Sequence, residues 1–142
     1  MIDGVFSSEI YQILEKSLNA ASWQHKLISN NIANINTPGY KTSEVVFKSK
    51  LKQILDAGEK TYLPLKLTHP NHIPVVPNFS IDKINPEIVT HTETSLRNDG
   101  NNVDIDREMA KLAENTTYYS SLAQLMTLKL GMLKNVISDG RR

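Results

Sequence analysis

The chain has 142 residues, which is enough for one domain with a modest hydrophobic core. Its 16 basic and 15 acidic side chains give a formal net charge of +1, which argues against a protein held to nucleic acid or a membrane surface by bulk electrostatics. The absence of cysteine excludes disulfides, thiolate nucleophiles and cysteine-ligated zinc.

No apolar run approaches the roughly 20 residues that a membrane-spanning helix needs. The first residues lack the basic and apolar regions of a cleaved signal peptide, so we expect any export to use a route that reads no such signal.

The prolines divide the chain into three segments. All six lie between residues 38 and 86, and the proline-free flanks permit long helices. We therefore predict a mainly α-helical protein whose long N- and C-terminal helices pair as an antiparallel coiled coil. The irregular, proline-rich middle segment is expected to contain at most short β-strands. The predicted segments are 1–37, 38–102 and 103–142, in one structural domain.

The N-terminal flank has apolar residues at alternating spacings of three and four, which is a heptad pattern. We expect this helix to begin near Ser7 or Ser8, either of which can cap it, and to end before Pro38. One face should pack against a partner helix, with His25 as a partly buried packing residue. The predicted seam consists of Tyr11, Leu14, Leu18, Ala21, His25, Ile28, Ile32 and Ile35.

The end of this helix is rich in asparagine, a poor helix former. We expect Asn34 and Asn36 to adopt left-handed geometry and cap the last carbonyls, before a type II turn at Pro38-Gly39. Two earlier asparagines lie a turn or more inside the helix, where their amides should bond neighbouring backbone or another chain. The four asparagines are Asn30, Asn31, Asn34 and Asn36.

The middle segment has a weaker pattern. Residues 43–47 are compatible with a short strand and residues 47–55 with one or two helical turns, followed by extended chain. His69 and His72 are the closest histidine pair, but no carboxylate follows them before Asp82, so a surface loop is a better interpretation than a metal site.

The C-terminal flank predicts the longest helix. Asp104 is a suitable N-cap, with acidic residues in the first turn. The stretch from Asp99 to Asp106 matches a calcium loop poorly, so we interpret it as a turn into this capped helix. The main apolar stripe, interrupted only by a threonine, is Ile105, Met109, Leu112, Thr116, Tyr119, Ala123, Met126, Leu130, Leu133 and Ile137.

A second stripe beside it makes the helix apolar on two faces, which is more than one partner helix covers. Its residues are Tyr118, Leu122, Leu125, Met132 and Val136.

Both flanks carry the residues of a known family. Residues 29–41, SNNIANINTPGYK, closely resemble the signature of the rod and hook proteins of the bacterial flagellum. Residues 99–119, DGNNVDIDREMAKLAENTTYY, are similar to a segment typical of its proximal rod proteins. The resemblance covers roughly residues 8–48 and 96–138. The motif residues are Asn30, Asn31, Ile32, Ala33, Asn34, Asn36, Thr37, Pro38, Gly39, Tyr40 and Lys41.

The resemblance to the flagellar basal-body rod family implies a structural subunit of the proximal rod, without catalysis or cofactor. It implies helical assembly around the export channel, torque transmission, and a periplasmic location reached by unfolded flagellar type III export. The implied partners are other copies of the chain, other rod proteins, the rod-base adaptor FliE and the export gate, with no nucleic acid and no small-molecule substrate. Phe6 and Ile10 have the spacing of the family's export-gate element, although they would also meet in a first helical turn.

Two alternatives stand beside this interpretation. A helical adaptor or chaperone-like module would grip a partner helix with its exposed stripe, but it would not need the asparagine motif. A metal-dependent enzyme, resting on His69 and His72, is remote. For the structural subunit, the residues expected to form helix packing and subunit contacts are Leu14, Leu18, Ile28, Ile32, Met126, Leu130, Leu133 and Ile137.

Overall fold

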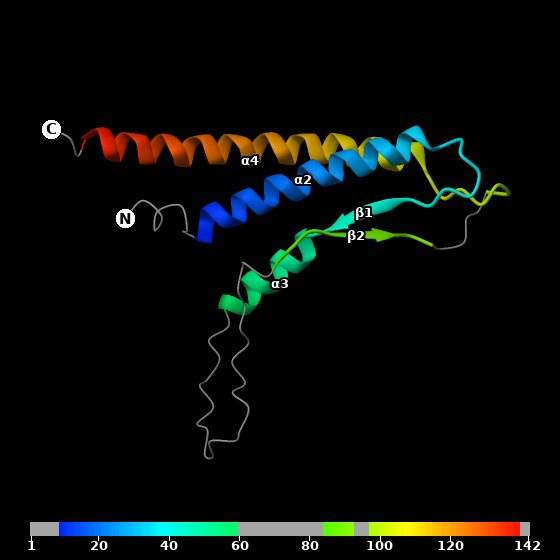
Figure 1. Ribbon diagram of the computed structural model, residues 1–142, viewed down its shortest axis with the longest axis horizontal. Helices are drawn as coiled ribbons and strands as arrows, with labels where there is room; N and C mark the ends of the chain where they lie inside the picture. Colours follow the sequence, from blue (N-terminus) through cyan, green and yellow to red (C-terminus); the bar gives the residue numbers. More distant parts are fainter. Residues whose placement is uncertain (1–8, 60–83, 93–96, 140–142) are drawn as a thin grey trace, which may run out of the picture.

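The computed structural model describes residues 9–59, 84–92 and 97–139. The protein is mainly helical, with long helices near both ends and two short strands between them, as predicted (Figure 1). Residues 60–83 and 93–96 of the predicted middle segment and the expected caps Ser7 and Ser8 lie outside the described residues. The elements are α2 (Glu9–Ala33), β1 (Ser43–Val46), α3 (Lys48–Glu59), β2 (Glu87–Thr90) and α4 (Ile105–Asp139).

The two long helices lie side by side and run in opposite directions (Figure 1). The Tyr11 hydroxyl donates to the Lys129 carbonyl at 3.3 Å, and the Asn115 side-chain amide donates to the Ala21 carbonyl at 3.0 Å. An early residue of α2 thus contacts a late residue of α4, and a later residue of α2 contacts an earlier one of α4. The two helices are therefore antiparallel. The helices have 25 and 35 residues, or about 38 and 53 Å.

A two-stranded antiparallel sheet and α3 pack beside α2. The register runs from Ser43 opposite Thr90 to Val46 opposite Glu87. The predicted strand ends one residue earlier than expected, and the predicted helical turns extend to the 12 residues of α3. A small core joins these elements, formed by Ala20, Phe47 and Ile84 with Val45, Leu51 and Ile54 packed around them. In the view of Figure 1, α2 lies between α4 and the strands.

The buried face of α2 includes Leu14, Ala21 and Ile28 of the predicted seam but differs from it at other positions. His25 is exposed, whereas Ser17 and Asn31, which lie outside the predicted set, are almost fully buried. The line of contact is therefore rotated around the helix, because polar side chains meet partners on that side. The buried residues are Leu14, Ser17, Ala20, Ala21, Ile28 and Asn31 on α2, and Glu108, Asn115 and Leu122 on α4.

The main apolar stripe of α4 stays largely in solvent. Leu130 is 42% exposed and Ile137 is 65% exposed. Lys111 and Glu114 lie on one side of the buried line of α4, where they form ion pairs with β1 and the start of α3. By the helical repeat, the main apolar stripe lies on the other side of this buried line. Neither the sheet nor α3 covers that side of α4. Ile105, Met109, Tyr119, Leu130 and Ile137 are the large exposed members of this open apolar face.

The other residues predicted for packing divide between the inside and the surface. Leu14 and Ile28 are buried, while Leu18, Ile32, Met126 and Leu133 are half-buried. No helix in the described part of the chain is both long and apolar enough to cross a membrane.

Two glycines in different backbone conformations allow a matched test of stability. Gly39 has a φ of +72°, whereas Gly131 lies inside α4, and neither has an atom within 4 Å of an added Cβ. Gly39→Ala should destabilise the protein by about 1–2 kcal/mol because the left-handed backbone strains an L side chain. Gly131→Ala should stabilise it by about 0.5–1 kcal/mol because alanine favours helix. Thermal unfolding of both variants measures the contrast, and equal effects would contradict this assignment.

Candidate functional site

The asparagine motif meets the start of α4 in a compact polar cluster. We call the contacts between residues 30–43 and residues 97–108 the helix-end junction. It joins segments that are more than sixty residues apart in sequence, as in the bond from Asn101 to the Thr37 carbonyl. It therefore couples the end of α2 to the beginning of α4.

Two glycine turns face each other in the junction. Gly39 has a φ of +72° and the Tyr40 amide donates to the Thr37 carbonyl at 3.3 Å, which fits the predicted type II turn. Gly100 has a φ of +74° in the opposing turn. The Gly39 amide donates to the Asp99 carbonyl at 2.8 Å, so the turns are joined backbone to backbone.

The predicted capping of α2 is confirmed in part, through the Asn34 side chain and not through left-handed geometry. Positive φ occurs only at glycine within the described residues, so Asn34 and Asn36 do not take left-handed geometry. The Asn34 side chain instead donates to the Asn30 carbonyl at 2.8 Å and accepts from the Thr37 hydroxyl at 3.1 Å. Asn30 and Asn36 have exposed side chains.

The turn that follows α2 is capped by Asn101, which lies close to the start of α4. Its side-chain amide donates to the carbonyls of Asn34, Ile35 and Thr37 at 2.9, 3.0 and 2.9 Å. Its side-chain oxygen accepts from the Val103 amide at 2.7 Å. These carbonyls belong to the turn that follows α2, and this fully buried amide satisfies them. The only sequence signal was the pair of asparagines after Asp99-Gly100.

Asn31 is the most connected residue of the motif. Its amide group donates to the Ser43 carbonyl at 3.0 Å and to Glu108 at 2.9 Å. Its oxygen accepts from the Tyr40 hydroxyl and the Ser43 amide, each at 3.2 Å. The expectation that this amide bonds neighbouring backbone is confirmed, and the same side chain holds α2, β1 and α4 together.

Glu108 is a buried carboxylate, only 2% exposed. One oxygen accepts from Asn31 and the other from the Lys111 ammonium at 3.1 Å. Lys111 also reaches Glu44 on β1 at 3.3 Å, and His91 lies 3.0 Å from the other oxygen of Glu44. Partial burial raises the pKa of Glu44, but the hydrogen bond from His91 and the charge of Lys111 together lower it below its usual range.

The sheet is attached to the junction by further polar contacts. Lys41 donates to the Gly100 carbonyl at 2.9 Å. The Thr42 amide donates to the side-chain oxygen of Asn102 at 2.8 Å, and the side-chain amide of Asn102 donates to the His91 carbonyl at 2.9 Å. One asparagine therefore connects the chain before β1 with the chain after β2.

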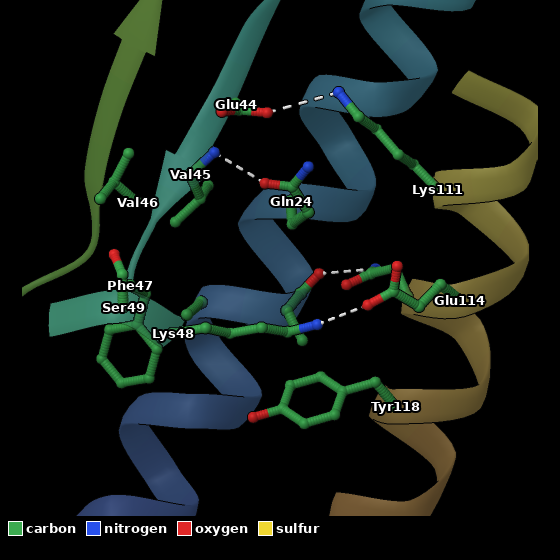
Figure 2. A pocket seen from close by; sticks show the side chains of 13 residues that line it. Gln24, Glu44, Val45, Val46, Phe47, Lys48, Ser49, Lys111, Glu114 and Tyr118 are labelled. Carbon is green, nitrogen blue, oxygen red and sulfur yellow. Dashed lines mark hydrogen bonds and ion pairs between the residues drawn. The ribbon is translucent and has the colours of Figure 1, made fainter. Parts of the chain in front are cut away.

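A hollow of about 320 Å³ lies over α2 between β1 and α4. Figure 2 shows Lys48 extending across it to Glu114, above the ring of Tyr118. Deeper in the hollow, the Val45 amide donates to the Gln24 side-chain oxygen at 2.7 Å. The walls are therefore tied by ion pairs and hydrogen bonds.

The remaining predicted site residues fall outside the junction. Phe6 of the export element, His69 and His72 lie outside the described residues, and Ile10 is 50% exposed at the first turn of α2. Within the described ranges no group of three or more His, Cys, Asp or Glu side chains is placed to hold a metal ion. The turn into a capped helix is confirmed, because Asp104 accepts from the Asp106 amide at 3.0 Å.

The buried cap gives a sharp prediction. Asn101→Asp keeps the shape but replaces the donor with a carboxylate facing three carbonyl oxygens, so we expect a loss of at least about 2 kcal/mol in the free energy of unfolding. Asn36→Asp is the control, because the same change at an exposed position of the motif should cost no more than about 0.5 kcal/mol. Denaturant unfolding of both variants is the measurement, and equal losses would show that Asn101 does not act as the cap.

Comparison with known proteins places these features in one family. A family model described as flagella basal body rod protein matches residues 12–41. The flagellar basal body rod protein FlgB of Bacillus subtilis is 39% identical over 137 residues, which covers 96% of this chain and 98% of that protein. FlgB of Borreliella burgdorferi is 34% identical over 102 residues, covering 72% and 76%. FlgB of Escherichia coli is 27% identical over 128 residues, covering 89% and 91%. By its motif and by its similarity along nearly the whole length of a curated relative, this chain belongs to the flagellar basal body rod protein FlgB family.

Proposed function

We propose that this chain is a structural subunit of the proximal flagellar rod, assembling helically around the export channel and transmitting torque without a catalytic step. The observation that carries the proposal is the open apolar face of α4. The names of the relatives, which are basal body rod proteins, give it context.

The open apolar face is too large to be a chance scatter of surface residues. Ile105 and Ile137, at opposite ends of α4, bound a stripe with large exposed side chains along its length. Fully burying one such side chain stabilises a contact by about 1.5–3 kcal/mol. A continuous exposed stripe of this kind marks a protein interface.

The second stripe adds another exposed surface on the C-terminal half of α4. Its members Leu125, Met132 and Val136 are more than half exposed, and Leu128 lies near them on the helix. Two different apolar faces allow two different neighbours. A subunit that uses unlike surfaces for successive contacts builds an open helical assembly and not a closed dimer.

We further propose that α2 and α4 continue as a coiled coil in the rod and that segments 1–37, 38–102 and 103–142 form one structural domain. The heptad spacing on both helices supports the first statement. The helix-end junction supports the second, because it ties the end of the first segment to the end of the middle segment and to the start of the third.

The proposed partners are other copies of the chain, other rod proteins, the rod-base adaptor FliE and, during export, the type III export gate. The proposed location is the periplasmic rod of the basal body. A helical adaptor is the alternative function, and it differs in a measurable way. An adaptor would form complexes of fixed size, whereas a rod subunit should form larger polymers as its concentration rises.

Charge on the open apolar face should block assembly. We predict that Leu130→Glu/Ile137→Glu leaves folding intact but abolishes polymer growth in sedimentation across a concentration series, because two carboxylates cannot be buried unpaired. In cells, the variant should be absent from purified basal bodies and motility should be lost. Asn135→Glu/Ser138→Glu adds the same charge at exposed polar positions and should assemble normally. Normal rods from the first variant would contradict the proposal.

The export element can be tested separately from assembly. We propose that Phe6 and Ile10 are read by the export gate, and Phe6→Ala should lower secretion several-fold without lowering the cellular level of the protein. Ser7→Ala is the control at a neighbouring position. Quantifying secreted and retained chain by immunoblot is the measurement, and undiminished secretion of Phe6→Ala would remove the element from the proposal.

A further inference from the structure

The contact between α2 and α4 is unusually polar for two packed helices. Four side chains on the buried faces are polar and at most 6% exposed, namely Ser17, Asn31, Glu108 and Asn115. The pattern is periodic, because Asn31 lies fourteen residues after Ser17 and Asn115 lies seven after Glu108. Polar side chains therefore return at the heptad spacing in the places where a coiled coil usually has apolar ones.

Asn31, Glu108 and Asn115 are satisfied by specific partners at different levels along the pair. Asn31 donates to Glu108 at 2.9 Å near one end, and Asn115 donates to the Ala21 carbonyl at 3.0 Å near the middle. Among the described residues, every buried side-chain nitrogen and oxygen has a hydrogen-bond partner. The arrangement of the two helices is therefore one in which all the polar groups match.

The apolar residues of the same contact do not distinguish between alignments of α2 and α4 that differ by one heptad. Leu14, Ala21 and Ile28 recur every seven residues, so sliding one helix by a heptad would again set apolar side chains against the partner. The same slip would carry Glu108 away from Asn31 and Lys111 away from Glu44. A buried group that loses its partner bears its full desolvation cost.

We infer that Asn31, Glu108 and Asn115 determine the register of α2 against α4, and that they do so in place of a more stable apolar contact. A buried polar pair often contributes less stability than apolar residues of similar volume, whereas its use in setting the register of paired helices is well established. The inference goes beyond the proposed function because it concerns contacts within one chain.

The register has a structural consequence at the end of the pair. The Gly39 amide reaches the Asp99 carbonyl, and the Asn101 amide reaches the carbonyls that follow α2, only when the helices are aligned in one register. The polar contacts along the pair and the cap at its end therefore select the same alignment. A slipped pair would lose both together.

Because the chain has no cysteine, two introduced cysteines can report the register with spin labels. Glu15→Cys and Ala110→Cys are exposed positions on α2 and α4, and their separation has a large component along the helix axes. The labelled chain is diluted into unlabelled wild-type chain, so that double electron–electron resonance detects distances within one chain in monomers and polymers alike. Without further substitutions, we expect one narrow distance distribution.

The test variant replaces both α4 polar residues, as Glu108→Leu/Asn115→Leu in the labelled chain. Asn31 keeps its contact with Ser43 and Gln24 keeps its contact with Val45, so α2 stays joined to β1. We expect a second distance displaced by about 10 Å, the length of one heptad, together with a thermal midpoint at or above that of the labelled parent. The matched control Asn135→Leu/Asp139→Leu changes one amide and one acid at exposed positions of α4 and should keep the single distance.

Each outcome of this experiment either supports or overturns the inference. A second distance in the test variant and not in the control supports the inference. A single native distance in the test variant overturns it. If that variant loses its helical circular dichroism, Asn115→Leu alone decides by the same criterion, and loss of helix in both would also overturn the inference, because the polar residues would then supply stability and not register.

Discussion

This structure depends on hydrogen-bond partners for its buried polar groups. A chain that turns inside a protein leaves carbonyl oxygens that need donors. In this chain the turn that follows α2 finds its donors on Asn101, more than sixty residues away in sequence. That turn therefore has its partners only when the last third of the chain is in place. The turns at Gly39 and Gly100, the bonds of Asn31 and the start of α4 all follow from that meeting.

The same constraint explains an inverted distribution of residues around the helix pair. Polar side chains occupy much of the contact inside the chain, and large apolar side chains occupy the open face of α4. In a monomeric globular protein this distribution would leave apolar surface in water and lower the stability of the fold. In a rod subunit, the polar contacts within the chain specify one conformation, and the exposed apolar area is available for contact with the next subunit. The two requirements are met on different faces of the same helices.

The sheet and α3 have a supporting role. They cover one side of the helix pair and leave the other open. The ion pair of Lys48 with Glu114 spans a hollow, and both of its side chains are exposed. Exposed pairs of this kind contribute only about 0–1 kcal/mol. The pair links the start of α3 to α4. Greater stability comes from the small core around Phe47 and from the buried bonds of Asn31.

The sequence by itself determined the local features of this protein. Proline positions and heptad spacing predicted the two long helices, Asp104 predicted the start of α4, and Pro38-Gly39 predicted the turn, because each depends on backbone preferences of neighbouring residues. The motif of residues 29–41 was enough to indicate the family.

Only the tertiary structure decided which face of each helix is buried and what holds the turn after α2. On α2 the predicted seam overlaps the buried face at Leu14, Ala21 and Ile28, whereas the main stripe of α4 lies beside the buried line. Asn34 caps α2 through its side chain and not through left-handed geometry, and Asn101 bonds the carbonyls that follow. Spacing shows that a helix has an apolar side, but it does not show whether that side meets the same chain or another one. Hydrogen bonds between distant segments settle this, and they depend on three-dimensional positions that no local pattern encodes.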